Sequence, residues 1–310
     1  MSTLPAPAPA PSAASAAAEA TPAPAPAAPY RGRARGPRRP LWRTALLMAG
    51  VLATIAVFLV PIYWLFSSAL KPRPDIYTWP LQWIPTRLTL DNFVAAWTSA
   101  PFGRFFLNSI ITTGVGTVLE ITLAVMCAYA FVFVDFRYKK IFFGLIVASL
   151  MLPGHVTLIV NYMTIANLGW LNTYQGLILP GIASAFAMFL LYQFMRTIDK
   201  DILQAAEIDG AGHLRRMLTI VVPLSSPMIL TSTLIVMVGK WNEYVWPLIV
   251  TSTADMRTLP IGLQFLRQQE GMSNWGAIMA GAVFVSLPML ILFFLAQKRI
   301  IGGLAAGALK

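Results

Sequence analysis

The chain has 310 residues, of which 57% are hydrophobic and 11% are charged, and its formal net charge is +11 at pH 7. Ordinary soluble domains carry about 25% charged residues, and a soluble fold this apolar would expose too much apolar surface to stay monomeric. The composition therefore excludes an ordinary soluble protein and predicts an integral membrane protein. The single Cys127 cannot form an intrachain disulfide, and with only two histidines no metal-ligand spacing is present.

Residues 1–40 are predicted to form a disordered cytoplasmic tail. Up to residue 29 they are almost all Ala, Pro, Ser and Thr, with a single charge at Glu19. This composition cannot build a packed core and is typical of disordered or polyproline II segments. The basic cluster at 31–39 either anchors the chain to anionic lipid or binds a specific partner. The apolar run that follows is longer than the core of a cleaved signal peptide.

Residues 41–310 are predicted to form the membrane domain. Six apolar runs are long enough to cross about 30 Å of hydrocarbon as helices. A backbone inside lipid must satisfy its own hydrogen bonds, which favours helices. The fold class predicted is an all-α integral membrane protein with about six transmembrane helices, placed near 44–66, 106–132, 141–163, 174–195, 228–250 and 275–297.

The distribution of basic residues predicts the orientation of these spans. Most of the 23 lysines and arginines fall in the N-terminal region, at 137–140, at 196–216 and at the C-terminus, all on one side of the membrane. Basic loops stay in the cytoplasm, so both termini are predicted to be cytoplasmic. The basic residues are divided among four separate segments, and no nucleic-acid partner is predicted.

The longest polar segment, 196–227, is predicted to hold a short helix at about 199–209. Apolar residues at 202, 203, 205, 206 and 208 give it one apolar face. Asp199 is placed to cap its N-terminus, and Gly210 to end it in the left-handed conformation. The small side chains of Ala205 and Ala206 allow another surface to approach the backbone of this helix closely. Such a helix is shaped to enter a groove on a partner protein.

This segment carries a family resemblance. The run Ala205-Ala206-Glu207-Ile208-Asp209-Gly210-Ala211, with Ile220 and Pro223-Leu224 downstream, resembles the "EAA" loop of ABC-importer permeases. The similarity is close to the carbohydrate-uptake branch, the maltose-type inner permease subunits, and covers roughly residues 44–310. The C-terminal residues 297–310 are also similar to the tail of that branch. The leading glutamate of the family is replaced by Gln204, so the small side chains and the glycine carry the resemblance.

The resemblance implies the type I ABC importer permease architecture in the cytoplasmic membrane of the cell. The implied partners are a second homologous permease, two ATPase subunits, an extracytoplasmic solute-binding protein and the lipid bilayer. ATP and Mg would be used by the ATPases, because this chain has no G-x-x-x-x-G-K-[ST] phosphate loop. The chain itself is expected to be a transport subunit and not an enzyme. The ATPase-coupling residues implied are Asp199, Gln204, Ala205, Ala206, Glu207, Asp209, Gly210 and Ala211.

Charged residues inside the predicted spans are the second candidate site, because they are costly in lipid and mark partners or wet cavities. Residues 240, 243, 244 and 247 share one face of a continuous helix. One interpretation is a sugar path of aromatic, amide and carboxylate groups. The other is an intrahelical Lys240–Glu243 pair with interfacial tryptophans. The candidate substrate-path residues are Glu120, His155, Asn161, Lys240, Trp241, Asn242, Glu243 and Tyr244.

Several alternatives stay open from the sequence. Glu120 either bonds a neighbouring helix or faces a cavity, and His155 is either a satisfied histidine at the Pro153-Gly154 kink or a proton carrier. Related permeases carry glycerol-3-phosphate or its diesters, whose phosphate would suit Lys240. An ion-coupled secondary transporter would use the same buried charges. A scaffold without transport is the remaining class.

Overall fold

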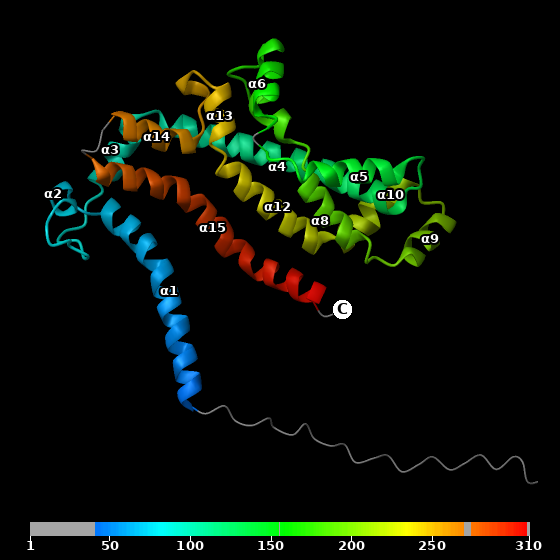
Figure 1. Ribbon diagram of the computed structural model, residues 1–310, viewed down its shortest axis with the longest axis horizontal. Helices are drawn as coiled ribbons and strands as arrows, with labels where there is room; N and C mark the ends of the chain where they lie inside the picture. Colours follow the sequence, from blue (N-terminus) through cyan, green and yellow to red (C-terminus); the bar gives the residue numbers. More distant parts are fainter. Residues whose placement is uncertain (1–40, 155, 270–273, 309–310) are drawn as a thin grey trace, which may run out of the picture. The chain divides into compact units, whose positions relative to one another are not determined.

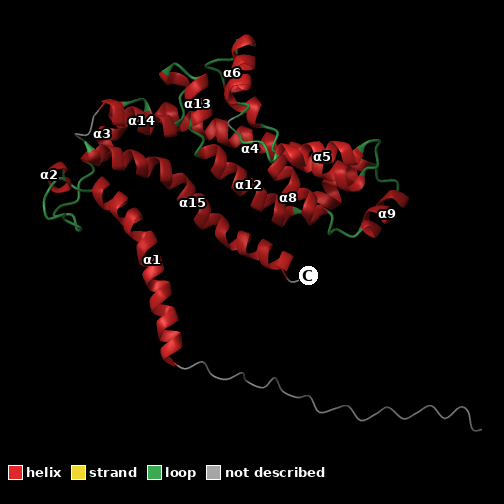
Figure 2. Ribbon diagram, in the orientation of Figure 1, coloured by secondary structure: helices red, strands yellow, loops and turns green. Residues whose placement is uncertain are grey.

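The computed structural model describes residues 41–154, 156–269 and 274–308, and all regular structure within them is helical (Figures 1 and 2). The predicted all-α fold class is therefore confirmed. The predicted disordered tail and His155 lie outside the described residues. The chain divides after Ile55 into two compact units. Both candidate sites, with the helices that position them, belong to the second unit.

Within the described ranges, three helices are long and apolar enough to cross a membrane unaided. They correspond to the first, second and sixth predicted spans, and are α1 (Leu41–Ala69), α4 (Phe102–Phe133) and α15 (Trp275–Ala308). Their apolar segments run over Ala45–Ala69, Phe102–Phe133 and Trp275–Leu295. Pro61 and Pro288 lie inside α1 and α15 without ending them.

Among the described residues, two bent helix pairs are also apolar enough to form spans, of which one coincides with the fourth predicted span and the other begins before the fifth and overlaps it. In the fourth, α7 (Tyr174–Ile178) and the short turn η1 (Leu179–Gly181) meet α8 (Ala185–Met195) at 45°. In the pair that overlaps the fifth, three consecutive helical pieces form one segment, namely α10 (His213–Arg216), the π-helical turn η2 (Met217–Val221) and α11 (Val222–Leu224). This segment meets α12 (Ser226–Trp241) at 80°. Prolines 180, 223 and 227 lie at these junctions, where the missing N–H groups favour a break.

Two of the predicted spans are corrected by the structure. The run at 141–163 is interrupted, because α5 (Lys139–Ser149) ends before Pro153-Gly154 and α6 (Leu158–Asn167) begins after it. An 11-residue helix is about 16 Å long, too short to cross the hydrocarbon alone. The run at 228–250 is also not one helix, since α12 ends at Trp241 and α13 (Val245–Val250) is separate.

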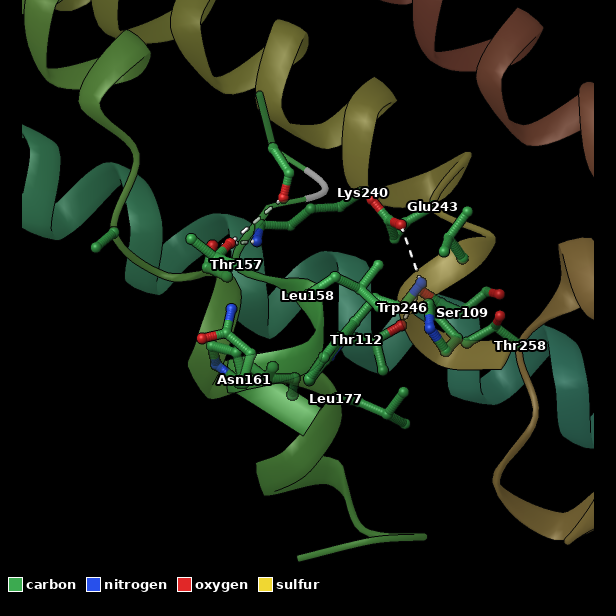
Figure 3. A pocket seen from close by; sticks show the side chains of 17 residues that line it. Ser109, Thr112, Thr157, Leu158, Asn161, Leu177, Lys240, Glu243, Trp246 and Thr258 are labelled. Carbon is green, nitrogen blue, oxygen red and sulfur yellow. Dashed lines mark hydrogen bonds between the residues drawn. The ribbon is translucent and has the colours of Figure 1, made fainter. Parts of the chain in front are cut away.

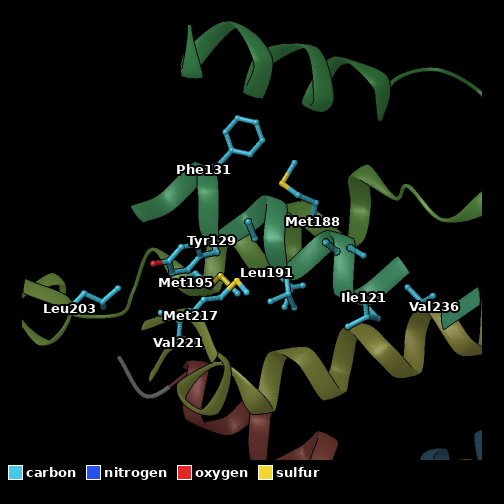
Figure 4. Close-up of a cluster of buried hydrophobic side chains, with 14 residues drawn as sticks. Ile121, Tyr129, Phe131, Met188, Leu191, Met195, Leu203, Met217, Val221 and Val236 are labelled. Carbon is cyan, nitrogen blue, oxygen red and sulfur yellow. The ribbon is translucent and has the colours of Figure 1, made fainter. Parts of the chain in front are cut away.

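Helix α4 is the centre of the second unit. It packs against α8 and α12, which lie beside it in Figure 1. Many of its buried residues are small, and Gly116, Ala124 and Ala128 let neighbouring backbones approach closely. The apolar cluster around its second half joins α4, α8, α12 and the polar segment (Figure 4), and includes Ile121, Tyr129, Phe131, Met188, Leu191, Met195, Leu203, Met217, Val221 and Val236.

The segment between α1 and α4 is organised by a buried lysine. Its helices are α2 (Arg73–Ile76) and α3 (Asp91–Ser99), and α3 packs against α15 and α14 (Leu259–Gln269). The Lys71 ammonium donates to the carbonyl of Gln82 and lies 4.3 Å from the centre of the Trp64 ring. Burial lowers the pKa of Lys71, while the nearby Asp75 carboxylate acts in the opposite direction. This segment is therefore a folded cap and not an open loop.

Candidate functional site

The polar segment folds as predicted into a short helix, α9 (Lys200–Ile208). The Asp199 carboxylate accepts a hydrogen bond of 3.0 Å from the amide of Asp201 and so caps the helix. Gly210 has φ +77°. The amides of Gly210 and Ala211 donate to the carbonyls of Glu207 and Ala206, which is the Schellman arrangement that ends a helix at a left-handed glycine.

Two contacts attach α9 to the membrane helices. Leu203 is buried in the cluster around α4. The Glu207 carboxylate accepts a bond of 2.7 Å from the guanidinium of Arg216, a residue in α10 that is itself 7% exposed. Nδ1 of His213 lies 3.4 Å from the same guanidinium and 3.3 Å from the Tyr129 hydroxyl at the end of α4. These contacts connect α9 to both α4 and α10.

The opposite surface of α9 is left open. Ile202 is 47% exposed and Ile208 is 87% exposed. Ala205 is exposed and Ala206 half-buried, while Gln204 and Asp209 are also exposed. The single apolar face predicted from the sequence is therefore divided, with Leu203 directed inward and the two isoleucines outward. An exposed surface of this kind on a helix end is typical of a docking site for another protein.

We expect Asp199→Ala to weaken α9 by about 1 kcal/mol, the usual cost of removing a helix N-cap. The measurement is amide hydrogen exchange at residues 201–203, which should quicken by roughly fivefold. Asp201→Ala serves as the matched control, because its side chain lies in the same turn but does not accept the capping bond. Equal protection in both variants would contradict this role for Asp199.

The second candidate site is a cavity of about 480 Å³ at the end of α12 (Figure 3). It lies between α4, α6, the α7–α8 junction and α13. Three of the predicted residues line it, namely Asn161, Lys240 and Glu243. Sequence reasoning missed its hydroxyl groups and its aromatic ring, which are Ser109, Thr112, Thr157, Thr258 and Trp246. Isolated serines and threonines in apolar runs carry no pattern that would distinguish them from helix-packing residues.

An ion pair inside the bundle borders the cavity. The Lys240 ammonium lies 2.8 Å from the Glu120 carboxylate and donates a second bond of 2.8 Å to the carbonyl of Gly181. It therefore joins α12, α4 and the bend between α7 and α8. The side chain crosses α4 at Gly116, where an added Cβ would lie 3.1 Å from Cδ of Lys240. Both charges are largely buried, with side-chain exposures of 19% for Lys240 and 8% for Glu120.

The structure corrects the predicted helix face at 240–247. Proline at 247 cannot donate to the carbonyl of residue 243, and its ring would clash with that carbonyl in a helix. The helix accordingly ends at Trp241. Lys240 therefore pairs with Glu120 and not with Glu243, while the Glu243 carboxylate accepts a 3.3 Å bond from the amide of Trp246.

Three further predicted path residues, Trp241, Asn242 and Tyr244, do not line the cavity. The Trp241 indole is buried and donates to the carbonyl of Val285 in α15. The Asn242 amide donates to Val238 in its own helix, and Tyr244 is half-buried. Within the described part of the chain, no three His, Cys, Asp or Glu side chains are grouped closely enough to hold a metal ion.

Comparison with known proteins places this architecture in a family. Residues 120–304 match the family described as "Binding-protein-dependent transport system inner membrane component". The chain is 33% identical over 270 residues to the sn-glycerol-3-phosphate transport system permease protein UgpE of Escherichia coli (strain K12), covering 85% of this chain and 96% of that one. The identity is 35% over 266 residues to the UgpE protein of Yersinia pestis bv. Antiqua (strain Antiqua), with 84% and 93% covered.

The fold is also similar to that of a solved transporter. A chain of a bacterial ABC transporter involved in the import of the acidic polysaccharide alginate superposes with a TM-score of 0.72 at 21% identity, covering 83% of this chain and 95% of that one. The family match covers residues 120–304, and the listed relatives exceed 30% identity over more than four fifths of the chain. The chain therefore belongs to the family of inner-membrane permease components of binding-protein-dependent ABC importers.

Proposed function

We propose that this chain is one of two transmembrane subunits of an importer for a carbohydrate or a sugar-like solute, driven by ATP hydrolysis on separate subunits. The observation that carries the proposal is α9, a capped helix with an open surface of small and apolar side chains. It is held to α4 and α10 by Leu203 and by the Glu207–Arg216 pair. An ATPase subunit that binds α9 would therefore also move α4, which lines the cavity.

The implied assembly contains a second homologous permease, two ATPase subunits and an extracytoplasmic solute-binding protein. ATP and Mg belong to the ATPases, and both termini of this chain lie in the cytoplasm. One solved relative of the same fold was crystallised with an alginate pentasaccharide-bound periplasmic protein. ATP binding would close the ATPases, carry α9 with them and shift the cavity between inward-facing and outward-facing packings.

The cavity chemistry supports a polyhydroxylated ligand. Its lining offers an amide at Asn161, a carboxylate at Glu243 and an indole ring at Trp246, which is fixed by a 3.0 Å bond to the carbonyl of Gly176. The Thr258 hydroxyl, also in the lining, has no hydrogen-bond partner among the described residues. Hydroxyl, amide and carboxylate groups bond sugar hydroxyls, while a flat ring covers a sugar face.

Glycerol-3-phosphate is the second candidate, because the curated relatives above are permeases for it. A phosphate would need a free cation, and Lys240 is already paired with Glu120. Glu243 adds a negative charge to the cavity lining. The electrostatics of this subunit therefore favour a neutral solute over a phosphate monoester.

The test is uptake by the assembled transporter in proteoliposomes. We expect Asn161→Ala to raise KM by about threefold to tenfold, the effect of one lost neutral hydrogen bond. Thr164→Ala is the matched control, since it lies on α6 and its hydroxyl bonds the helix backbone at Val160. Uptake that does not require ATP but is lost when an ion gradient is dissipated would refute the proposal in favour of a secondary transporter.

A further inference from the structure

A second pocket, of about 550 Å³, lies at the ends of α4 and α8, beside the start of α9. Four cationic side chains line it, from Lys139, Lys140, Arg196 and Lys200, together with one acid, Asp135. The pocket follows directly on the apolar helix Phe102–Phe133, so it lies where hydrocarbon gives way to headgroups. None of these residues takes part in the cavity that contains Lys240.

Most of this positive charge is not neutralised by the protein. Lys139 is engaged, with its ammonium 2.8 Å from the carbonyl of Val134 and 3.4 Å from the carboxylate of Asp135. The guanidinium of Arg196 lies over the Tyr192 ring, 5.6 Å from its centre. Across the described ranges, Lys140, Arg196 and Lys200 form no ion pair with a carboxylate. These three cations are therefore available to bind an anionic ligand in the pocket.

The wall of the pocket is aromatic and continuous with an exposed apolar surface. The rings of Phe143 and Tyr192 pack at a tilt of 39° with centres 4.3 Å apart, and the Phe131 ring packs against Phe143 at 5.6 Å. Beyond Phe143, α5 has no buried residue. Its side chains Ile141, Phe142 and Leu145 are 59%, 52% and 63% exposed. A ligand that enters this pocket can therefore place a charged group among the cations and apolar chains along α5.

We propose that this pocket binds the phosphodiester headgroup of an anionic phospholipid. Basic pockets between membrane helices on the cytoplasmic side recognise such headgroups, and the exposed face of α5 accommodates the acyl chains. Lys200 is the first residue of α9, and Arg196 is the first residue of the polar segment, directly after α8, so the lipid holds the N-terminal end of α9 at the membrane surface. The inference rests on the membrane location and not on the solute.

The experiment is native mass spectrometry of the full transporter taken from nanodiscs. One set contains phosphatidylcholine alone, and the other an equimolar mixture with phosphatidylglycerol. We expect phosphatidylglycerol to be retained by the native protein and its affinity to fall by about thirtyfold in the Lys140→Gln/Arg196→Gln variant. Arg137→Gln is the matched control, because Arg137 lies in the same loop over the Tyr138 ring and outside the pocket. It should retain the lipid.

Three outcomes would overturn the proposal. One is equal lipid retention by the native protein and the double variant. Another is inorganic phosphate displacing phosphatidylglycerol at millimolar concentration, which would identify a free anion as the ligand. The third is loss of the ATPase subunits from the double variant with lipid retention unchanged, which would assign the pocket to a protein interface. Lys140→Gln alone, at an exposed side chain, repeats the test if the double variant fails to assemble.

Discussion

Gly210→Val should abolish solute uptake while leaving the transporter assembled and its ATPase active. The residue has φ +77°, a conformation that costs a residue with a side chain about 1–2 kcal/mol and a β-branched residue more. No atom lies within 4 Å of an added Cβ, so the effect is due to the backbone and not to a steric clash. Without the left-handed turn, the segment from α9 to α10 loses its fixed geometry.

The measurement is the ratio of solute transported to ATP hydrolysed in proteoliposomes. We expect this ratio to fall at least tenfold for Gly210→Val. Gly210→Asn should retain most of it, because asparagine tolerates the left-handed region. Gly212→Ala is a matched control two residues away, with φ −69° and open space around its Cβ position. Normal uptake by a well-assembled Gly210→Val protein would contradict the proposed role of the turn.

Lys240→Met should destabilise the membrane domain by roughly 3–5 kcal/mol, the cost of leaving a buried charge without its partner. Glu120 would then be an unpaired carboxylate within the bundle, and the carbonyl of Gly181 would lose its donor. Glu120→Gln should have a similar effect by leaving the ammonium unpaired. The variants are compared by thermal unfolding of the purified complex.

The double variant Lys240→Met/Glu120→Gln is the decisive comparison. Because both charges are removed together, we expect most of the lost stability to return, which gives a large coupling energy in the double-mutant cycle. Asp255→Asn, at an exposed side chain, controls for the loss of one charge and should change stability by less than about 0.5 kcal/mol. Additive losses in the double variant would show that the pair is not coupled.

The sequence predicts those parts of the fold that depend on local chemistry. Asp199 caps α9 and Gly210 ends it because both effects involve neighbouring residues alone. The long apolar helices follow from composition in the same way. The interrupted third span was not predicted, because hydropathy continues across Pro153-Gly154 while the backbone does not. Pro247 similarly ended the helix face expected at 240–247.

The candidate site depends more on contacts distant in sequence, and there prediction was less complete. The sequence indicates that the charges of Glu120 and Lys240 are costly to place inside lipid. The ion pair between them joins residues 120 positions apart, and it depends on how α4 and α12 pack at Gly116. The hydroxyl groups that line the cavity look like ordinary packing residues in a single sequence. In the sequence, Arg216 contributes only to the positive charge of the polar segment, whereas the folded protein buries its side chain against Glu207.

Because of the 80° bend before α12, a small rotation at the bend would displace the far end of this helix by a larger distance. Its 16 residues span about 24 Å, so a rotation of about 10° at the bend would sweep its far end through about 4 Å. The lysine at that far end holds two other helices through bonds of 2.8 Å, which cannot stretch by such a distance. We therefore expect a rotation at this bend either to move the neighbouring helices together with α12 or to break those two bonds.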